Sequence, residues 1–365
     1  MTIREISNLL EKIAPVSLQE SYDNAGLLTG DGSWDCKGII TCLDATEEVV
    51  LEAVSKNCNL VVAHHPIIFK GLKKITGKNY VEKTIITAIK NDIAIYAIHT
   101  NLDNVLEGVN GRIADKLGLQ NRTILLPKEN LLQKLAVFVP VAHKPVLMEA
   151  MFAAGAGNIG NYSECSFSAT GSGSFKAGAG TDPFVGKPGE RHYENEEKLE
   201  VVFPAWLQFQ VLKAMRSAHP YEEIAYDIYP LLNSYGQTGS GLAGELETAM
   251  DERDFLALLQ DKFGLSLVRH TSFTGKKVKK VSVCGGAGSF LTGAAIATGA
   301  DVYVTGDVKY HEFFDADGKL LLADIGHYES EQFTIDLLFD ILRQNFPNFA
   351  ILKTGVQTNP VHYFY

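Results

Sequence analysis

Residues 37–66 read KGIITCLDATEEVVLEAVSKNCNLVVAHHP, and the order of elements in this stretch sets the fold class. An apolar, β-branched run ends at Asp44, helical spacing follows over 47–57, and a second apolar run leads to His64 and His65. A strand, a helix and another strand in this order are typical of a parallel sheet built by right-handed crossovers. The stretch therefore predicts an α/β fold.

The same alternation continues along the chain. Residues 80–92 have helical spacing, and 93–103 (IAIYAIHTNLD) form a third apolar run with polar residues at its end. The last third repeats the pattern, with strands predicted over 278–284, 300–306 and 319–324 and helices between and after them. We expect a main domain of two βαβ-type halves with parallel sheets, one in residues 1–127 and one in 237–365.

Polar side chains follow these predicted strands. The carboxyl ends of parallel strands lie at one edge of a sheet, where ligands bind. His327 and Glu331 are four residues apart at a predicted strand-to-helix junction, and this spacing places both side chains on one helical face. The first rim is expected to hold Asp44, His64, His65, His99 and Asp103, and the second Asp307, His311, His327 and Glu331.

The middle of the chain, residues 128–236, has a different character. Its apolar and helical runs follow the order βαββαβ, which is the ferredoxin-like pattern. The Gly/Ser/Pro-rich stretch at 177–189 is predicted to be a surface loop. Because the polar residues of the two flanking halves read as partners in one site, we interpret 128–236 as an inserted domain.

The pair His64-His65 carries the first chemical argument. Adjacent side chains in a regular strand point to opposite faces, so the two rings cannot share one metal ion there. Pro66 is expected to break the strand, after which the rings can address two ions side by side. The alternative is two structural histidines, with Asn101 and Asp103 as turn or capping residues and Ser330 or Glu331 complementing a helix N-terminus.

Three His/carboxylate clusters at predicted strand ends favour the metal interpretation over these separate structural roles. Imidazoles with carboxylates and no thiolate suit Zn, Mn, Fe or Ni. Glu331 is our candidate for a carboxylate that bridges two ions. We expect most of the lysines at 70, 73, 74 and 78 to be solvated, with one free to hold a phosphate, as the amides of Gly285, Gly286 and Gly288 also could.

Composition excludes several functions. The 365 residues carry a net charge of −10, which argues against binding nucleic acid or an anionic membrane through the whole surface. The 5 cysteines are scattered, without a CxxC pair, so we expect reduced thiols rather than disulfides. The N-terminus reads as an acidic amphipathic helix, not a signal peptide, and no apolar run approaches the ~20 residues of a membrane helix. We expect a cytoplasmic protein.

Several motifs together resemble the GTP cyclohydrolase I type 2 family, also called the NGG-interacting-factor-three-like proteins. They are SYDNAGLLTG, LDAT, AHHPIIFKGLKK, AIHTNLDN, VCGGAGS, ADVYVTGDVKYHE and GHYESE. The stretch AHPYEEIAYDIYPL resembles the PII/CutA-like domain that some bacterial members carry as an insertion. The resemblance implies GTP as substrate and a toroidal homohexamer. It also implies two divalent metal ions per subunit, held by His64, His65, Asp103, His327 and Glu331.

Two hypotheses follow. The first is a dinuclear-metal-dependent hydrolase that acts on a nucleotide or another anionic small molecule through a metal-activated water, with zinc expected before iron, manganese or nickel. His99 would move protons in that reaction. The second is a non-catalytic, metal-binding regulatory or metal-handling hexamer in which the inserted domain is a sensor or gate. The two hypotheses differ in the metal coordination that they require. A catalytic metal ion keeps one coordination position open for water, whereas a structural metal site has all its positions filled by the protein.

Overall fold

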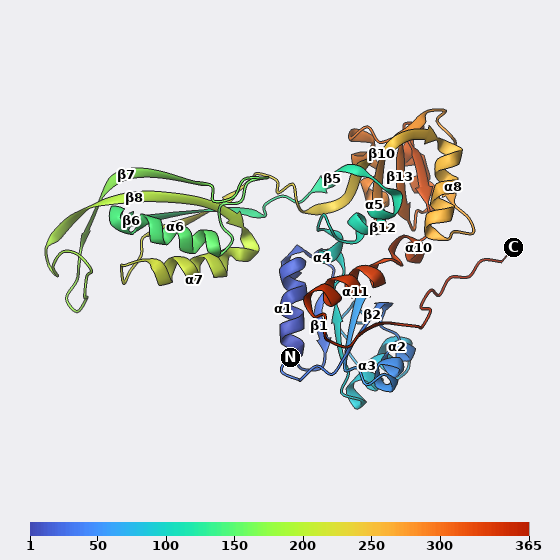
Figure 1. Cartoon of the computed structure of the whole chain (residues 1–365), viewed down its shortest axis with the longest axis horizontal. Helices are drawn as coiled ribbons and strands as arrows, with labels where there is room; N and C mark the ends of the chain where they lie inside the picture. The colour runs from blue at the N-terminus through green and yellow to red at the C-terminus, as the bar shows by residue number, and fades with distance from the viewer. Residues whose placement is uncertain (365) are drawn as a thin grey trace. The chain divides into compact units, whose positions relative to one another are not determined.

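The computed structural model describes residues 1–364. The chain divides into two compact units, which we call the larger and the smaller unit. The larger unit joins Met1–Pro127 to the residues from Gln237 onward, and the smaller unit is Lys128–Gly236. Each unit has its own sheets and its own buried core (Figure 1).

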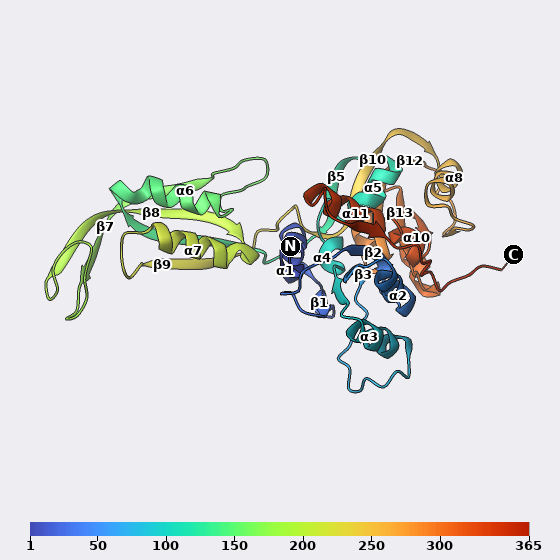
Figure 2. The ribbon, with the colours of Figure 1, turned by 60° about the horizontal axis from the view of Figure 1, so that its bottom comes forward.

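The first sheet of the larger unit has the strand order β1-β4-β3-β2-β15. β2, β3, β4 and β15 are parallel, and β1 pairs antiparallel with β4. Helices α2 and α3 pack on one face of it over a core that includes Val50 and Ile85 (Figure 2). The strands are β1 Gly26–Thr29, β2 Ile39–Asp44, β3 Leu60–His65, β4 Ala94–Ala97 and β15 Ile351–Lys353, and the helices are α2 Glu47–Ser55 and α3 Tyr80–Lys90.

The second sheet has the order β11-β14-β13-β12-β10-β5. Only β12, β13 and β14 are parallel to one another, and the remaining strands join antiparallel. Both sheets of the larger unit are therefore mixed: the first has one antiparallel edge strand, β1, and the second has antiparallel strands on both sides of its parallel centre. The strands are β5 Gln120–Pro127, β10 Gly239–Asp251, β11 Arg269–His270, β12 Lys277–Ala287, β13 Val302–Gly306 and β14 Leu321–Asp324.

One apolar core joins the two sheets. It buries Val62 of β3 together with Val281 of β12 and Val302 of β13, and helices α1, α5, α8 and α11 contribute to it. Burial of this surface brings the carboxyl ends of the two parallel centres into one unit. The helices of the larger unit not yet given are α1 Ile3–Ile13, α4 Thr100–Asp103, α5 Val109–Leu117, α8 Glu252–Phe263, α9 Thr292–Ala297, α10 His327–Glu331 and α11 Thr334–Asn345, with 3₁₀ helices η1 Val16–Leu18, η4 Ser289–Leu291 and η5 Tyr310–Ala316.

The smaller unit is one antiparallel sheet of order β7-β8-β6-β9 with two helices on it. Its core includes Leu135, Met151 and Met215 and is separate from that of the larger unit. The elements are β6 Leu132–Pro140, η2 Val141–His143, α6 Lys144–Ala153, β7 Ser166–Lys176, β8 Arg191–Pro204, η3 Ala205–Leu207, α7 Gln208–Ala218 and β9 Tyr226–Leu231.

The mixed α/β class with several sheets is confirmed. β3 ends at His65, directly before Pro66 as expected, so both histidines lie at the end of the strand itself. Their ring centroids are 4.9 Å apart; β4 pairs with β3 only as far as Ala63, whereas β2 still pairs at His65. All five cysteines are free; Cys165 is half-buried and the other four are buried. Within residues 1–364, no helix is long and apolar enough to cross a bilayer.

Candidate metal centre

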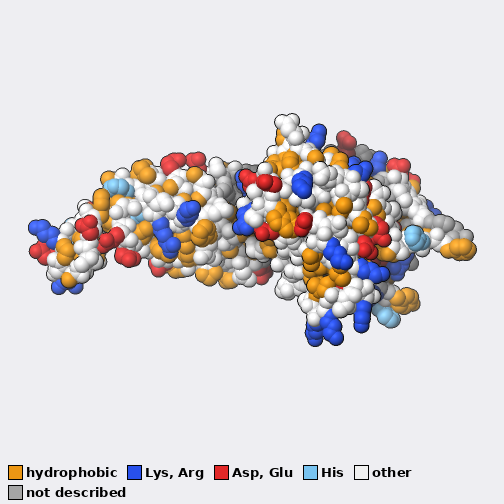
Figure 3. Space-filling model, turned by 90° about the horizontal axis from the view of Figure 1, so that it is seen from below, with side chains coloured by type: hydrophobic (Ala, Val, Ile, Leu, Met, Phe, Trp, Pro, Cys, Tyr) orange, Lys and Arg blue, Asp and Glu red, His pale blue; other side chains and the backbone are white. Residues whose placement is uncertain are grey.

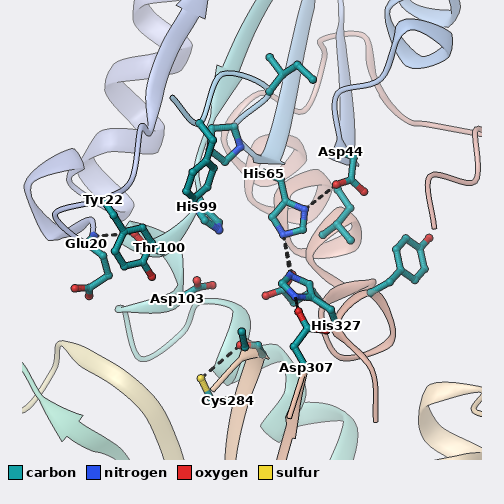
Figure 4. Close-up of a pocket in the computed structure, with 18 of the residues that line it drawn as sticks. Glu20, Tyr22, Asp44, His65, His99, Thr100, Asp103, Cys284, Asp307 and His327 are labelled. Atoms are coloured by element: carbon teal, nitrogen blue, oxygen red, sulfur yellow. Dashed lines mark hydrogen bonds and ion pairs between the residues drawn. The ribbon is translucent and has the colours of Figure 1, made fainter. Parts of the chain in front are cut away.

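A cavity of about 880 Å³ opens in the larger unit at the carboxyl ends of the parallel strands. Asp44 and His65 reach it from β2 and β3, and His99 and Asp103 from the segment after β4. His327 reaches it from the first turn of α10 on the other side, where it faces His65 (Figure 4).

Four histidines direct the same ring nitrogen toward one cluster of side chains, and three of them line the cavity. In each ring Nδ1 donates its hydrogen to a fixed acceptor, which leaves Nε2 to face the centre. Outer partners of this kind set the tautomer and orientation of metal-binding histidines. The Nδ1 contacts are His64 to Ile98 O at 2.9 Å, His65 to Asp44 Oδ1 at 2.8 Å, His99 to Asp23 Oδ1 at 2.8 Å and His327 to Asp307 Oδ2 at 2.7 Å.

Glu331 lies at the centre of the cluster and is 3% exposed. Its Oε2 is 2.9 Å from His65 Nε2 and 3.1 Å from His327 Nε2. Its Oε1 lies on the other side, 3.9 Å from His64 Nε2, which in turn is 3.6 Å from Asp103 Oδ1. Oε2 of Glu331 thus lies near His65 and His327, and Oε1 lies on the side of His64 and Asp103.

Local sequence explains how Glu331 reaches this position. Gly326, at φ 91°, precedes α10, and the (i, i+4) spacing then sets His327 and Glu331 on one helical face. β12 passes beside the carboxylate at Gly286, where an added Cβ would lie 2.4 Å from Glu331 Oε1. Gly286 also has φ +64°, which favours glycine. The glycine run after Cys284 therefore makes room for the acid.

Charge in the cluster is concentrated and mutually compensated. Burial would raise the pKa of Glu331, but hydrogen bonds from His327 and His65 outweigh it and hold that pKa well below its usual value. Burial would likewise lower the pKa of His65, yet its bonds to Asp44 and Glu331 raise the pKa to about 10. Burial and the nearby charge of Glu331 raise the pKa of Asp103 to about 7. A cation bound here would displace protons from these groups.

Two orphaned atoms show that the residues fit a metal ion. His64 Nε2 and Asp103 Oδ1 are buried without a hydrogen-bond partner among the described residues. Their separation of 3.6 Å is too long for a hydrogen bond. Unpaired buried polar atoms are costly, and a cation between an imidazole nitrogen and carboxylate oxygens would satisfy both. The His/Glu cluster can therefore hold a metal ion.

The structure brings together six of the residues singled out from the sequence. They are His64, His65, His99, Asp103, His327 and Glu331, which fall in three overlapping groups of possible ligands. His311 does not join them, contrary to our expectation. It is exposed in η5, and its ring packs against Tyr310 and Phe314 at 5.1 and 6.4 Å. The chain turns at Asp307, with φ 53°, so that Asp307 reaches His327 while η5 leads His311 away.

The expected phosphate-binding role of the glycine amides was also wrong, because all three amides are already used. Gly285 N donates to Asn110 Oδ1 at 2.9 Å, Gly286 N to Ser330 Oγ at 2.9 Å and Gly288 N to Thr305 Oγ1 at 3.0 Å. Gly285 and Gly286 belong to strand β12, so they do not form a free helix N-terminus.

Two outer contacts were missed from the sequence. Asp23 accepts a hydrogen bond from His99 Nδ1 through Oδ1 and one from the Thr100 amide through Oδ2. Burial would raise its pKa, but hydrogen bonds from the His99 ring and the Thr100 hydroxyl lower it to about 2. Asp23 lies in the motif SYDNAG, but it is 76 residues from His99, and no sequence pattern relates the two. Thr358 Oγ1 donates to Asp44 Oδ2 at 2.7 Å, so the C-terminal segment supports the carboxylate that orients His65. No pattern in the sequence points to that contact.

The fold and the cluster together define an α/β protein with a candidate His/carboxylate metal centre in its larger unit. Residues 1–360 match the family described as Duf34/NIF3 (NGG1p interacting factor 3), and the chain belongs to that family.

Relatives and solved structures agree with this assignment over nearly the whole chain. A Halalkalibacterium halodurans protein named GTP cyclohydrolase 1 type 2 homolog is 39% identical over 361 residues, which are 97% of each chain. A Bacillus subtilis protein of the same name is 40% identical over 327 residues, 89% of this chain and 88% of the relative. The crystal structure of a Bacillus cereus protein related to NIF3 is 38% identical, with a TM-score of 0.86 over 100% of this chain and 99% of that one.

Proposed function

We propose that the protein is a dinuclear-metal-dependent hydrolase. The observation that carries this proposal is the division of Glu331 between two sets of side chains, since a shared carboxylate is the usual partner of two adjacent ions. His64 and Asp103 would hold one ion, His65 and His327 the other, and Glu331 both. The donors are nitrogen and oxygen only, which suits zinc first, with iron, manganese or nickel as alternatives.

Such a pair of ions, when bound, activates a water molecule near neutral pH and offsets the negative charge that develops during hydrolysis. The chain itself supplies a residue to carry the proton. His99 is held through Nδ1 by ionised Asp23 and presents Nε2 to the cavity. An imidazole oriented by a buried carboxylate is a suitable general acid or base. We therefore assign proton transfer to His99.

The substrate class rests on the relatives, which are named GTP cyclohydrolase 1 type 2 homologs. A nucleotide-type substrate is the corresponding proposal for this chain. The cavity of about 880 Å³ has room for a molecule of that size.

A comparison of the wild-type chain with His64→Ala/His65→Ala and with His99→Gln tests the function. We expect elemental analysis to find two divalent ions per wild-type chain and at most one in the double variant. His99→Gln should keep the metal but lower turnover of a nucleotide panel by ~100-fold or more, as loss of a general acid-base group does. Mass spectrometry would follow turnover. If the wild-type chain binds metal but turns over no nucleotide, the hydrolase proposal fails and the regulatory or metal-handling alternative takes its place. If His99→Gln loses metal, His99 is a metal ligand rather than a proton carrier.

We further propose that Lys128–Gly236 is an inserted ferredoxin-like domain of the PII/CutA-like type, in a cytoplasmic homohexamer whose ring contacts come from the larger unit. The βαββαβ order and the separate core support the insertion. Replacement of 128–236 by a short Gly/Ser linker should leave the larger unit folded and metal-bound. Circular dichroism and elemental analysis would detect global unfolding with metal loss, which contradicts the insertion.

Light scattering of the same variant should still report an oligomer. A monomer would show that the inserted domain makes the contacts of the ring.

A further inference from the structure

Polar contacts hold the C-terminal segment, residues 354–364, to the larger unit. The segment follows β15, and within the described part of the chain no residue after Ile351 is buried. At its base Thr354 Oγ1 and Gly355 N donate hydrogen bonds to Glu52 of α2, at 2.6 and 3.0 Å. Figure 3 shows the far end of the chain projecting from the larger unit at the right of the view. Burial of apolar surface therefore contributes little here, and hydrogen bonds fix the path of the segment.

Three consecutive residues of this segment, 357–359, join two elements beside the proposed metal centre. The middle residue contacts the end of β2, and its two neighbours contact α10. β2 belongs to the first sheet, whereas α10 follows β14 of the second sheet. We call residues 357–359 the C-terminal clamp. Its contacts are Tyr328 Oη to Gln357 Oε1, Thr358 Oγ1 to Asp44 Oδ2 at 2.7 Å, and Asn359 Nδ2 to Glu329 Oε1 at 3.1 Å.

The clamp acts next to two of the proposed ligands. Asp44 Oδ1 accepts from His65 Nδ1 at 2.8 Å, so the carboxylate that receives Thr358 also orients that ring. The clamped turn of α10 begins with His327. His65 Nε2 and His327 Nε2 lie 3.4 Å apart although their elements belong to different sheets. The spacing of these two nitrogens therefore depends on how firmly the end of β2 and α10 are held together.

α10 needs outside support because it is short. It spans only His327–Glu331, and a helix of little more than one turn is unstable by itself. One support comes from Gly286 N, which donates to Ser330 Oγ at 2.9 Å. The clamp adds two more, at Tyr328 and Glu329. The Glu329 contact requires only an acceptor oxygen, which Glu329→Gln retains.

The other proposed ion position is built without the clamp. His64 Nδ1 donates to Ile98 O, and Asp103 lies in α4. Among the hydrogen bonds and ion pairs of residues 1–364, none joins either residue to residues 357–359. The two ion positions thus differ in their dependence on the C-terminal segment.

We infer that the C-terminal clamp sets the spacing between His65 and His327, and that Thr358 and Tyr328 are positioning residues for the metal ion that these two histidines would hold. The inference rests on the proposed function and gives the C-terminal segment a part in it. The ion between His64 and Asp103 should depend on the clamp far less.

Stepwise competition between the full chain and a colorimetric zinc chelator, which resolves two zinc affinities, tests the inference. Thr358→Val and Tyr328→Phe each remove one hydroxyl and keep the shape of the side chain. We expect each to lower one of the two affinities ~10-fold or more, as loss of an outer partner does, and to leave the other nearly unchanged. Thr358→Ser keeps the hydroxyl and should bind zinc as the wild type does.

The matched control is Thr354→Val, which removes a hydroxyl from the same segment at Glu52, where the Gly355 amide still binds. It should leave both zinc affinities unaltered. A second control places Thr358→Val in an Asp44→Ala chain. There the change should have no further effect, because the threonine acts through that carboxylate.

Two unchanged affinities in both Thr358→Val and Tyr328→Phe would overturn the inference. So would an equal fall of both affinities, which indicates general loosening, or a loss that persists in the Asp44→Ala chain.

Hydrogen exchange of the α10 amides in the metal-free chain, measured by mass spectrometry, separates the clamp from the proposed function. Exchange should be faster in Thr358→Val and Tyr328→Phe than in the wild type and Thr354→Val, and equal rates in all four chains would refute the clamp. A wild-type chain that binds no zinc would refute the metal centre alone, since exchange still shows whether the clamp holds α10.

Discussion

Glu331→Gln should remove most of the metal from the protein. The carboxylate faces both His65 and His327 through one oxygen and the His64–Asp103 pair through the other. A neutral amide has one acceptor oxygen and cannot bridge, so two cations would lie close together without shared negative charge. Outer partners of metal ligands already contribute 10–100-fold to affinity, and we expect a loss above ~100-fold for this direct ligand.

Competition with a colorimetric zinc chelator would measure that affinity on chains reloaded with equal amounts of zinc. The matched control is Glu329→Gln, two residues earlier in the same helix. Glu329 accepts from Asn359 and does not touch the cluster, so its variant should retain wild-type affinity. Equal zinc affinity in Glu331→Gln and the wild type would remove Glu331 from the centre and the bridging role with it.

Gly286→Ala is expected to damage the same centre without changing any ligand. Its Cβ would lie 2.4 Å from Glu331 Oε1 and 3.3 Å from His327 Cε1. The carboxylate is the mobile end of a side chain, so it would move while β12 stays in place. We expect zinc affinity to fall by ~10–100-fold, as for other losses of ligand orientation. The positive φ adds a stability cost of about 1–2 kcal/mol, which denaturant unfolding would show.

The control for Gly286→Ala is Gly293→Ala in α9, where an added Cβ would have no atom within 4 Å. That change should leave zinc affinity unaltered and stabilise the helix by up to about 1 kcal/mol. Gly286→Ala with full metal affinity would show that Glu331 can approach the histidines from another direction. The glycine run would then serve the strand rather than the metal centre.

Much of the candidate site was predictable because its ligands follow strands that the sequence marks clearly. β2 and β3 end at Asp44 and His65, and β4 ends two residues before His99. Local pattern fails where a single turn changes direction. His311 follows a predicted strand, as the candidate ligands do, yet the left-handed turn at Asp307 directs it to the surface.

The amino-acid sequence by itself determined the order of strands and helices, the distinct character of residues 128–236 and a set of nine polar side chains at predicted strand ends, six of which form the cluster. These follow from periodicity and residue type, which act over a few neighbouring residues. The tertiary structure decided which ring nitrogen each histidine presents, that the glycine amides are occupied, and that Asp23 and Thr358 support His99 and Asp44. Those contacts join residues as far apart as 314 positions. Strand pairing within a sheet and the packing of the two sheets bring such residues within hydrogen-bonding distance, so no local pattern encodes them.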